Sequence, residues 1–379
     1  MAATTHPEFN ANTEAFQVAE AFPQAIRGKT VLVTGVNRNG IGFTTSQAFV
    51  NAIQLLDTTI ILIAEQASQS PTHLIITGRS PVKIQDSINA LKEKWPEVTY
   101  HGLQVDLSIQ KSVRDAAAKV MGWSDVPTID IIVNSAGIMS GEKERVLSED
   151  GVEMHFATNH IGHWLFTCLI MPKLIKAAEK NPAGATRIVN VTSASPQVSG
   201  IRWSDMNFEK KNKDLPIEEQ PEYEWFRLWG YTSLKEMTYT PLDGYNRSKV
   251  ANVLSGIAAN KRLFGQHGIL ALAVHPGVIA TELGRTLPEE TLQEVGQMLE
   301  QGLFTFKTLG AGSSTSMVAA LDPKLAQGVG ETRNGSENWG SYLDDCQISG
   351  QGHSLAVSSN EAEKLWQISE RLVGQSFAW

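Results

Sequence analysis

The sequence predicts an α/β protein built on a doubly wound, parallel β-sheet with helices on both faces. Short runs rich in Val, Ile and Leu recur along the chain, and each is followed by a helical segment. From residue 29 onward, a strand, a glycine-containing turn and an apolar helix follow one another directly. Strands that alternate with helices in this way indicate a parallel sheet. The length of 379 residues suits one large domain, and we expect a lead-in (1–28) and a single domain (29–379).

The expected strands are β-branched runs bounded by glycine or polar residues. In chain order they lie at 29–35, 73–79, 98–106, 128–137, 185–195 and 268–277, with a short one at 339–345. The expected helices follow the apolar periodicity of helical segments. They lie at 16–26, 43–72, 80–95, 112–123, 151–180, 245–265, 311–321 and 360–374. The segment 43–72 is longer than one crossover helix needs, so it predicts an extended helix or a helix pair.

Composition excludes several classes of protein. The net charge of −8 argues against nucleic acid or an anionic membrane as the main partner. No apolar run approaches the ~20 residues that a membrane span needs. The first residues carry acidic side chains and no apolar core, so we expect no signal or transit peptide. The chain has only two cysteines, Cys168 and Cys346, which predicts no disulfide framework and favours a cytoplasmic protein.

The glycine turn after the first strand indicates a dinucleotide site. A strand, a glycine loop and a helix N-terminus bind a pyrophosphate, because free backbone N–H groups face the phosphates. In TGVNRNGIG, Gly35 makes the tight turn, Gly40 lets the backbone approach phosphate, and Gly42 lets the helix pack on the strand. The glycine order is G-x-x-x-x-G-x-G rather than G-x-G-x-x-G, so a plain strand-to-helix turn is the alternative interpretation.

The end of the second strand indicates which dinucleotide is bound. A carboxylate at this point accepts hydrogen bonds from the ribose hydroxyls of NAD, and it is absent here. Arg79 and Ser80 stand in its place, and Arg38 lies within the glycine loop. A guanidinium grips phosphate oxygens in a fork, so the pattern favours the 2′-phosphate of NADP(H). The alternative is that both arginines are solvated surface residues.

The segment YNRSK places Tyr245 and Lys249 one helical turn apart, on one face of a helix. A free phenol has a pKa near ~10. At an effective dielectric of ~20, a lysine ammonium ~4 Å away favours the phenolate by up to ~4 kcal/mol. We therefore expect Lys249 to lower the pKa of Tyr245 by as much as ~3, so that the tyrosine can exchange a proton with a carbonyl oxygen.

A second Tyr-x-x-x-Lys pair, Tyr231 with Lys235, competes for this role. Only the Tyr245 motif carries a serine just before the lysine and continues into an apolar helix. Only its distance to Pro276 suits one helix and one strand. We therefore assign the proton donor to Tyr245.

Residues 200–240 interrupt the alternation of strands and helices with a charged run and many aromatic side chains. A loop of this length in a compact domain is usually functional or disordered. We expect part of it to be ordered beside the pocket, with Trp225, Phe226 and Trp229 covering an apolar, ring-containing substrate. The alternative is that these aromatics merely anchor the loop to the domain.

These segments, in this order, resemble the short-chain dehydrogenase/reductase family over residues 29–282. The resemblance is carried by TGVNRNGIG, Arg79, Asp106-Leu107, NSAG, Asn159, Ser193, YNRSK and PGVIAT. ATNHIGHWLFT, RIVNVTS and KLWQISERLVG resemble the retinol-dehydrogenase and WW-domain-oxidoreductase-like branch, and its fungal members above all. Three features depart from the family pattern: one extra residue in the glycine loop, NSAG in place of NNAG, and an unusually long spacing from Ser193 to Tyr245.

The resemblance implies a Rossmann-type fold and a set of site residues. Tyr245 would be the general acid in carbonyl reduction, Lys249 would lower its pKa and hold the nicotinamide ribose, and Ser193 would hydrogen-bond the substrate oxygen. Asn159 would hold a water that relays protons through Lys249. The cofactor-binding residues would be Gly35, Asn37, Arg38, Gly40, Ile41, Gly42, Arg79, Ser80, Asp106, Leu107, Asn134, Ala136, Gly137, Tyr245, Lys249, Pro276, Gly277, Val278 and Thr281.

The resemblance implies an NADPH-dependent ketoreductase or carbonyl reductase, acting on a ketone or aldehyde and its alcohol, such as a fungal secondary metabolite. A dehydratase or epimerase on the same scaffold and a non-catalytic NADP-binding sensor stay open as alternatives. The substrate side would include 283–379. His155, His160 and His163 lack an acidic third ligand at a regular spacing, so we expect no metal. Because the insertion 200–240 enters the helix that relatives use for tetramer contacts, we expect a monomer or homodimer.

Overall fold

The computed structural model describes residues 4–51, 70–287 and 289–379. Its centre is an eight-stranded sheet, and seven of the strands run parallel. In spatial order the strands are β12 (Gln347–Ile348), β11 (Tyr342–Asp344), β6 (Ile269–His275), β5 (Thr186–Val191), β4 (Ile131–Asn134), β1 (Thr30–Val33), β2 (His73–Gly78) and β3 (Thr99–Gln104). Strand order reverses between β1 and β4, which is where a doubly wound sheet opens a ligand crevice at its carboxyl edge. The predicted parallel, doubly wound α/β fold is confirmed.

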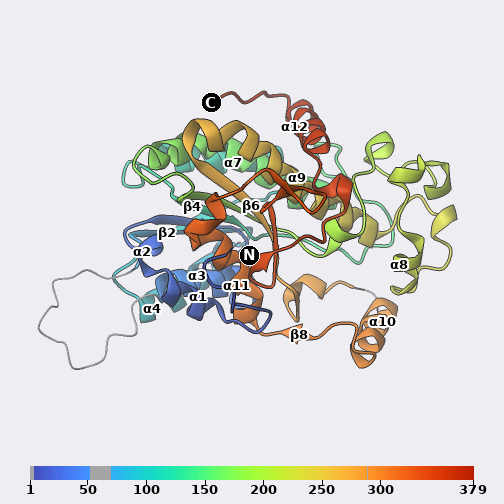
Figure 1. Ribbon diagram of the computed structural model, residues 1–379, viewed down its shortest axis with the longest axis horizontal. Helices are drawn as coiled ribbons and strands as arrows, with labels where there is room; N and C mark the ends of the chain where they lie inside the picture. Colours follow the sequence, from blue (N-terminus) through green and yellow to red (C-terminus); the bar gives the residue numbers. More distant parts are fainter. Residues whose placement is uncertain (1–3, 52–69, 288) are drawn as a thin grey trace, which may run out of the picture.

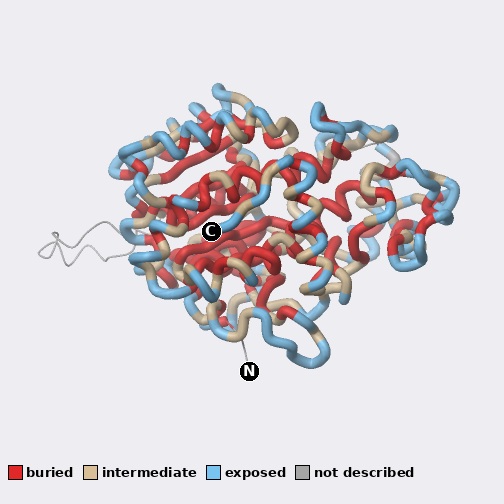
Figure 2. The backbone as a smooth tube through the Cα atoms, turned by 90° about the horizontal axis from the view of Figure 1, so that it is seen from above, coloured by how far each residue is buried: buried red, intermediate tan, exposed pale blue. Residues whose placement is uncertain are grey.

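Helices cover both faces of the sheet (Figure 1). One layer contains α1 (Ala15–Ala21), α2 (Pro23–Ile26), α3 (Ile41–Val50), α4 (Pro81–Lys94) and α11 (Leu309–Leu321). The other contains α5 (Gln110–Gly122), α7 (Gly162–Ala178), α9 (Pro241–His267) and α12 (Ser359–Val373). Successive strand residues face opposite layers: Leu32 packs in one core cluster, and Val31 and Val33 pack in the other. The sheet is therefore buried on both sides, as Figure 2 shows, and its carboxyl edge is left for the site.

Three helical predictions differ from the structure. The helix expected at 16–26 is divided at Phe22, because Pro23 has no N–H to continue the first helix and instead begins α2. Helix α3 ends at Val50, and most of the remaining segment predicted to be helical, 52–69, lies outside the described residues. The helix expected at 151–180 consists of α6 (Met154–Phe156), a π-helical turn (Ala157–Ile161) and α7.

The insertion folds into a series of short helices beside the carboxyl edge (Figure 1). They are the 3₁₀ turns 203–205, 212–214, 217–219 and 234–236, together with α8 (Tyr223–Arg227). Two buried arginines attach it to α9. Arg247, which forms an ion pair with Asp243 of the same helix, donates to the carbonyls of Gly200 and Glu219, and Arg202 of the insertion lies 3.9 Å from Asp243. The insertion is thereby fixed to the helix that carries Tyr245.

The remaining elements follow β6 and were mostly not predicted. They are β7 (Val278–Ile279), α10 (Glu289–Glu300), β8 (Phe306–Lys307), β9 (Glu331–Arg333) and β10 (Ser336–Trp339). Strand β7 pairs with β8, and β9 pairs with β10. These strands are too short to give a readable alternation of apolar and polar residues.

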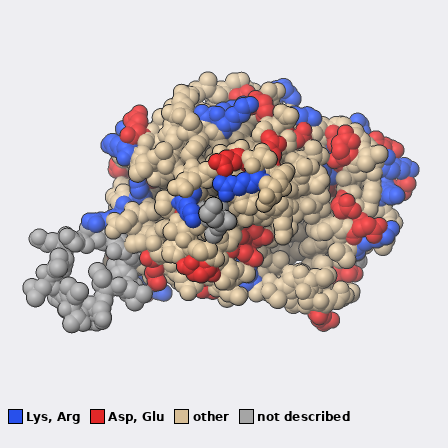
Figure 3. Space-filling model, in the orientation of Figure 1, with Lys and Arg blue, Asp and Glu red and all other residues tan. Residues whose placement is uncertain are grey.

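Acidic and basic side chains are intermingled across the face of the molecule shown in Figure 3. Among the described residues, no helix combines the length and the apolar composition needed to cross a bilayer.

Acid should destabilise the fold through its buried histidines. Burial lowers the pKa of His160 to about 3, and its Nε2 lies 2.9 Å from the Ser369 hydroxyl. The unfolded chain takes up a proton near pH ~6.5 and the folded chain does not, so stability is full above that pH and falls as the pH drops toward 3. The cost for this one group is ~3 kcal/mol between pH 7 and about pH 4.5. Urea unfolding at both pH values measures it.

The matched variant is His160→Gln, which keeps a hydrogen-bonding side chain without a titrating group. Its free energy of unfolding should depend less on pH than that of the wild type by about that amount. An unchanged pH dependence would show that His160 is not held neutral in the folded state.

Candidate active site

The first turns of α9 carry Tyr245, Ser248 and Lys249 to the carboxyl edge of the sheet. The helix begins where Pro241 occupies its first turn and the Thr240 hydroxyl accepts the N–H of Asp243. The carbonyl of Lys249 accepts the Thr192 hydroxyl, which ties the helix to the end of β5. Tyr245 and Lys249 are both buried, and the Tyr245 ring lies edge-on to His155 of α6.

The electrostatics of Tyr245 differ from the prediction. Burial raises the pKa of Tyr245 to about 12, and the hydrogen bond with the Ser193 hydroxyl lowers it only in part. Lys249 does not reverse this effect. Burial lowers the pKa of Lys249 to about 8, its Nζ donates to the Val191 carbonyl at 3.0 Å, and it lies 5.5 Å from the centre of the tyrosine ring. In this state Tyr245 is a protonated phenol, which is the form a general acid needs.

Ser193 lies beside Tyr245, and the neighbouring hydroxyls of the TSAS segment are engaged elsewhere. Thr192 is buried and donates to the Lys249 carbonyl, and Ser195 is buried and bound to Asn246. Ser193 is only half-buried and hydrogen-bonds Tyr245. Of the three hydroxyls, it is therefore the one placed to reach a substrate oxygen.

Asn159 occupies the π-helical turn between α6 and α7. Its side-chain oxygen accepts the N–H of Ile138 at 2.8 Å, and its amide nitrogen donates to the Ile138 carbonyl at 3.0 Å and to the Ser248 hydroxyl at 2.9 Å. The side chain thus joins the loop after β4 to the Tyr245 helix. π-Turns recur at functional sites because they redirect one residue of a helix.

The competing pair, Tyr231 and Lys235, does not form a comparable arrangement. Tyr231 lies in the loop after α8, and Lys235 is in a separate 3₁₀ turn with its Nζ over the ring of Tyr223. Burial raises the pKa of Tyr231. The geometry favours Tyr245.

The glycine loop has the shape that a pyrophosphate needs. Gly35 has a φ of +71°, and a Cβ there would lie 2.5 Å from Cα of Ala136. Helix α3 begins at Ile41, and its N-cap Gly40 has no side chain to cap it. Within the described structure the N–H groups of Ile41 and Gly42 have no partner. Donors left free at a helix N-terminus attract an anion. The loop therefore fits the phosphates of a dinucleotide.

Asn37 adds a second sign of a missing partner, because its buried Oδ1 accepts no hydrogen bond from the described residues. Arg38 is half-exposed and lies 3.7 Å from Asp86 on α4. Arg79 follows β2 and is exposed, and its guanidinium makes no ion pair with any described residue. Ser80 caps α4 by accepting the N–H of Lys83 at 3.4 Å, which leaves its proton free to donate.

The predicted adenine side is formed by the ends of β3 and β4. One oxygen of Asp106 accepts the N–H and hydroxyl of Ser108, and no described residue binds the other. Leu107 is buried against Gly162. A Cβ added to Gly162 would lie 2.1 Å from the carbonyl oxygen of Leu107. Ala136 N–H donates to Thr34, and a Cβ on Gly137 would lie 3.5 Å from Nζ of Lys249.

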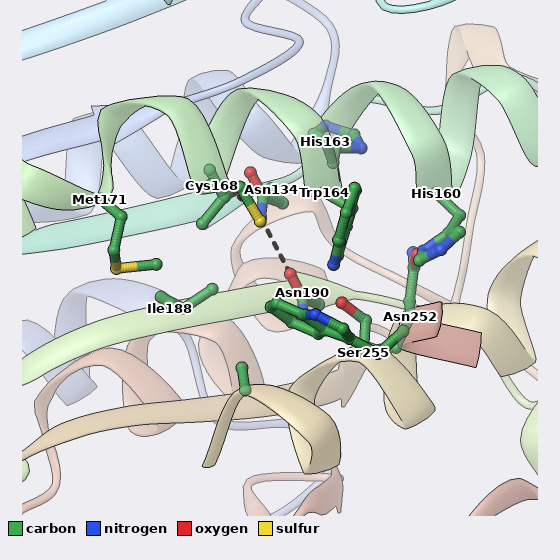
Figure 4. A pocket seen from close by; sticks show the side chains of 13 residues that line it. Asn134, His160, His163, Trp164, Cys168, Met171, Ile188, Asn190, Asn252 and Ser255 are labelled. Atoms are coloured by element: carbon green, nitrogen blue, oxygen red, sulfur yellow. Dashed lines mark hydrogen bonds between the residues drawn. The ribbon is translucent and has the colours of Figure 1, made fainter. Parts of the chain in front are cut away.

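Asn134 is the last residue of β4, and its contact with the cofactor stays a prediction. Its side chain points away from this edge, into a cavity of about 20 Å³ under α7 (Figure 4). Its Nδ2 donates to Asn190 at 2.9 Å, and its Oδ1 is buried without a partner among the described residues. Only the backbone of this segment can therefore face a cofactor.

The PGVIAT segment follows β6 along the same edge. Pro276 is buried. Gly277 has a φ of +85°, and a Cβ added there would lie 2.6 Å from the side-chain carbons of Lys307. Val278 pairs with Phe306, and the Thr281 hydroxyl accepts the N–H of Leu283. These residues form a turn against the 306–307 strand at the nicotinamide end that the resemblance implies.

The three histidines noted in the sequence bind three different partners. His155 Nδ1 lies 2.8 Å from Glu153, His160 contacts Ser369, and His163 lies 2.8 Å from the Thr34 hydroxyl. Among the described residues, no group of His, Cys, Asp and Glu could hold a metal ion.

Sequence reasoning missed two groups beside the site. The Ser195–Asn246 pair joins Ser193 to the Tyr245 helix, and Arg247 joins the insertion to that helix. In the sequence, these groups could have been suspected only from the serines of TSAS and from the residues between Tyr245 and Lys249 in YNRSK. A sequence alone does not show that these two segments meet.

The insertion places aromatic side chains over the loop after β4. Phe226 is fully buried and anchors a cluster that includes Trp225, Trp229 and Met139. Trp229 lines a cavity of about 10 Å³ together with Met139, Ser140, Gly141, Tyr231, Pro241, Leu242, Leu287 and Thr291. The cluster therefore lies next to Ile138, to which Asn159 is bound.

Comparison with known proteins identifies the family. The model of the short chain dehydrogenase family matches residues 61–205. The chain is 33% identical over 269 residues to "Oxidoreductase fscI" of Fusarium equiseti, which covers 71% of this chain and 94% of the relative. It is 28% identical over 358 residues to retinol dehydrogenase 14 of Homo sapiens, covering 93% and 88%. Its fold is similar to that of an uncharacterized protein from Mycobacterium Paratuberculosis, with a TM-score of 0.57, 21% identity, and 93% and 96% of the two chains covered. An identity of one third over nearly the whole of a relative shows that this chain belongs to the short-chain dehydrogenase family of oxidoreductases.

Proposed function

We propose that the protein is an NADP(H)-dependent reductase that interconverts a ketone or aldehyde and its alcohol. The observation that supports this most is the meeting of Tyr245, Ser193 and Lys249 at the sheet edge that also carries the open glycine loop. These side chains come from two separate elements, and a purely structural arrangement would not require a buried lysine beside a buried phenol. Burial of both groups costs free energy that a catalytic role explains.

The proposed roles follow from the geometry. The glycine loop from Gly35 to Gly42 would hold the pyrophosphate of NADPH, which would supply the hydride for the carbonyl carbon. Tyr245 gives its proton to the carbonyl oxygen, and the Ser193 hydroxyl hydrogen-bonds that oxygen as charge develops on it. Lys249 stabilises the phenolate that remains, and Asn159 holds the loop after β4 against the same helix. In alcohol oxidation Tyr245 takes the proton back.

The test is a fluorescence titration with NADPH, followed by its decay with a panel of aromatic and polyketide-like ketones and aldehydes. Binding and decay on at least one carbonyl support the reductase. Binding without decay on any carbonyl favours a non-catalytic NADP-binding protein, and turnover without net oxidation of NADPH favours an epimerase or dehydratase.

We propose an apolar, ring-containing substrate such as a fungal secondary metabolite. Support comes from the aromatic cluster beside Met139 and from the fungal relative that is named an oxidoreductase. We further propose that the enzyme is cytoplasmic. We also propose that it is a monomer or homodimer, because the insertion is packed on α9 through Arg247. Size-exclusion chromatography with light scattering tests the oligomeric state.

Replacing Trp225 with alanine should raise KM for a good carbonyl substrate roughly 10-fold, because a large apolar contact is lost. Trp225 is half-buried and packs on Trp229 at 5.5 Å between ring centres. Leu228→Ala is the matched control, since Leu228 lies in the same segment and is 50% exposed. Steady-state kinetics of both variants decide the matter; unchanged kinetics in Trp225→Ala would mean that the aromatics only anchor the insertion.

A further inference from the structure

A short hydrogen-bonded chain lies behind Ser193. The Ser193 hydroxyl is 2.7 Å from the Ser195 hydroxyl, and the Ser195 hydroxyl is 2.7 Å from Oδ1 of Asn246. The backbone N–H of Ser195 also donates to the Ser193 hydroxyl, at 3.0 Å. Ser195 and Asn246 are both buried. Asn246 directly follows Tyr245 on α9, so the chain leads from the proposed catalytic serine back to the proposed catalytic helix.

The protons along this chain can be counted. A hydroxyl has one proton, and a carbonyl oxygen can only accept. With Oδ1 of Asn246 facing Ser195, the Ser195 proton goes to Asn246. The contact between the two serines must then use the only proton of Ser193. In this arrangement Ser193 has no proton left for a substrate oxygen.

The same arrangement leaves the amide nitrogen of Asn246 buried with no partner among the described residues. Leaving a buried donor without a partner destabilises this arrangement. Half a turn of the amide exchanges its oxygen and nitrogen, which have nearly the same shape. The nitrogen then donates to Ser195, and Ser195 donates to Ser193. Ser193 now accepts two hydrogen bonds, one from the N–H and one from the hydroxyl of Ser195. Its own proton then points to the side of Tyr245, with which Ser193 is hydrogen-bonded, and is available to a substrate oxygen there.

We propose that Asn246 and Ser195 are positioning residues, and that the Asn246 amide nitrogen, turned toward Ser195, directs the Ser193 proton to the substrate oxygen. This inference rests on the proposed role of Ser193. The direction of the whole chain is set by the side chain of Asn246, which hydrogen-bonds Ser195 and acts on Ser193 only through it.

The variant Asn246→Asp tests the direction of the chain. It keeps the shape of the side chain, but an ionised carboxylate can only accept, whereas a protonated carboxyl can donate. At about pH 8 the variant should reduce carbonyls ~10- to 100-fold more slowly than the wild type, with KM for NADPH unchanged, because one donor to the developing oxyanion is lost. The ratio of variant to wild-type kcat should recover as the pH falls through the pKa of the carboxyl.

Asn246→Ala is the matched control, because it can neither accept nor donate and should show no recovery in acid. A flat ratio for Asn246→Asp, parallel to that of Asn246→Ala, would overturn the inference. Ser195→Ala and Ser195→Thr provide a second pair if the aspartate variant does not fold. Threonine keeps the hydroxyl and should recover most of the kcat that alanine loses; equal losses would also overturn the inference.

Two further measurements separate this inference from the proposed function. Ser193→Ala should lose kcat; full activity in that variant would overturn both proposals, whereas a loss there with a flat ratio for Asn246→Asp overturns only the inference. In the free enzyme, ¹⁵N NMR can follow the Asn246 side-chain NH₂, assigned by its absence in Asn246→Ala. Its exchange with solvent should become faster in Ser195→Ala. No change in that rate would show that the nitrogen does not face Ser195.

Discussion

Replacing Tyr245 with phenylalanine should lower kcat for carbonyl reduction by ~10²- to 10⁴-fold, the usual contribution of a general acid. The change removes one hydroxyl group and keeps the buried ring. NADPH binding, followed by fluorescence, should stay close to that of the wild type, because only the proton donor is lost. Steady-state and single-turnover kinetics measure the effect.

Tyr231→Phe is the control for this experiment, since Tyr231 heads the competing Tyr-x-x-x-Lys segment. It should keep most of kcat, because Tyr231 lies in the insertion and Lys235 faces Tyr223. Equal losses in the two variants would mean that the proton donor is not assigned correctly. A loss of NADPH binding in Tyr245→Phe would instead indicate that the hydroxyl holds the cofactor.

The pKa values of this pair also give the direction of the pH dependence. Tyr245 is protonated at neutral pH, because burial raises its pKa to about 12. Lys249 loses its charge near pH 8, because burial lowers its pKa to about 8. A neutral Lys249 stabilises the phenolate less, so carbonyl reduction is favoured below that pH and weakened above it. The sequence suggested the Tyr245–Lys249 pair but not the direction of these two pKa shifts, because spacing along a helix says nothing about burial.

Most of the sheet could be predicted from sequence because its strands are buried on both faces. β1, β4 and β6 read as continuous apolar runs, so their positions follow from composition alone. The π-helical turn at Asn159 could not be read in this way, because it inserts into an apolar helix without changing the pattern of residues. Likewise, the buried Arg247 looks like a surface residue of a helix until its partners, which are backbone carbonyls 28 and 47 residues away in sequence, are known.

The candidate site was predictable where one motif carries the function and not where two motifs meet. The glycine loop, Ser193 and YNRSK each stand out in the sequence. The insertion separates β5 from α9 in the sequence, yet the two elements lie side by side in the fold. The link between Ser193 and Asn246 depends on this contact, which no local sequence pattern predicts. Asn134 shows the effect of register: its side chain faces the interior because its odd or even position on β4 decides which face it occupies.

The last prediction is the choice of NADP(H) over NAD(H), which we attribute to Arg79. This residue follows β2, where a carboxylate would bind the ribose hydroxyls of NAD and repel a 2′-phosphate. Its guanidinium is exposed and is not bound in an ion pair with any described residue. Arg38 lies in the glycine loop, and its guanidinium is 3.7 Å from the carboxylate of Asp86. Both side chains are exposed, so this contact is weak and easily replaced.

Charge-assisted hydrogen bonds to a phosphate are worth roughly 1.5–3 kcal/mol each. Two of them predict a preference for NADPH of at least ~100-fold in kcat/KM. Arg79→Ala should remove most of that preference by raising KM for NADPH, and it should hardly change kinetics with NADH. Lys83→Ala is the matched control: it removes a nearby positive charge that is already paired with Glu282 at 3.2 Å, so it should leave the preference intact. A wild-type enzyme that uses both cofactors equally well would contradict the assignment, as would equal effects of the two variants, because a general loss of positive charge would then be sufficient.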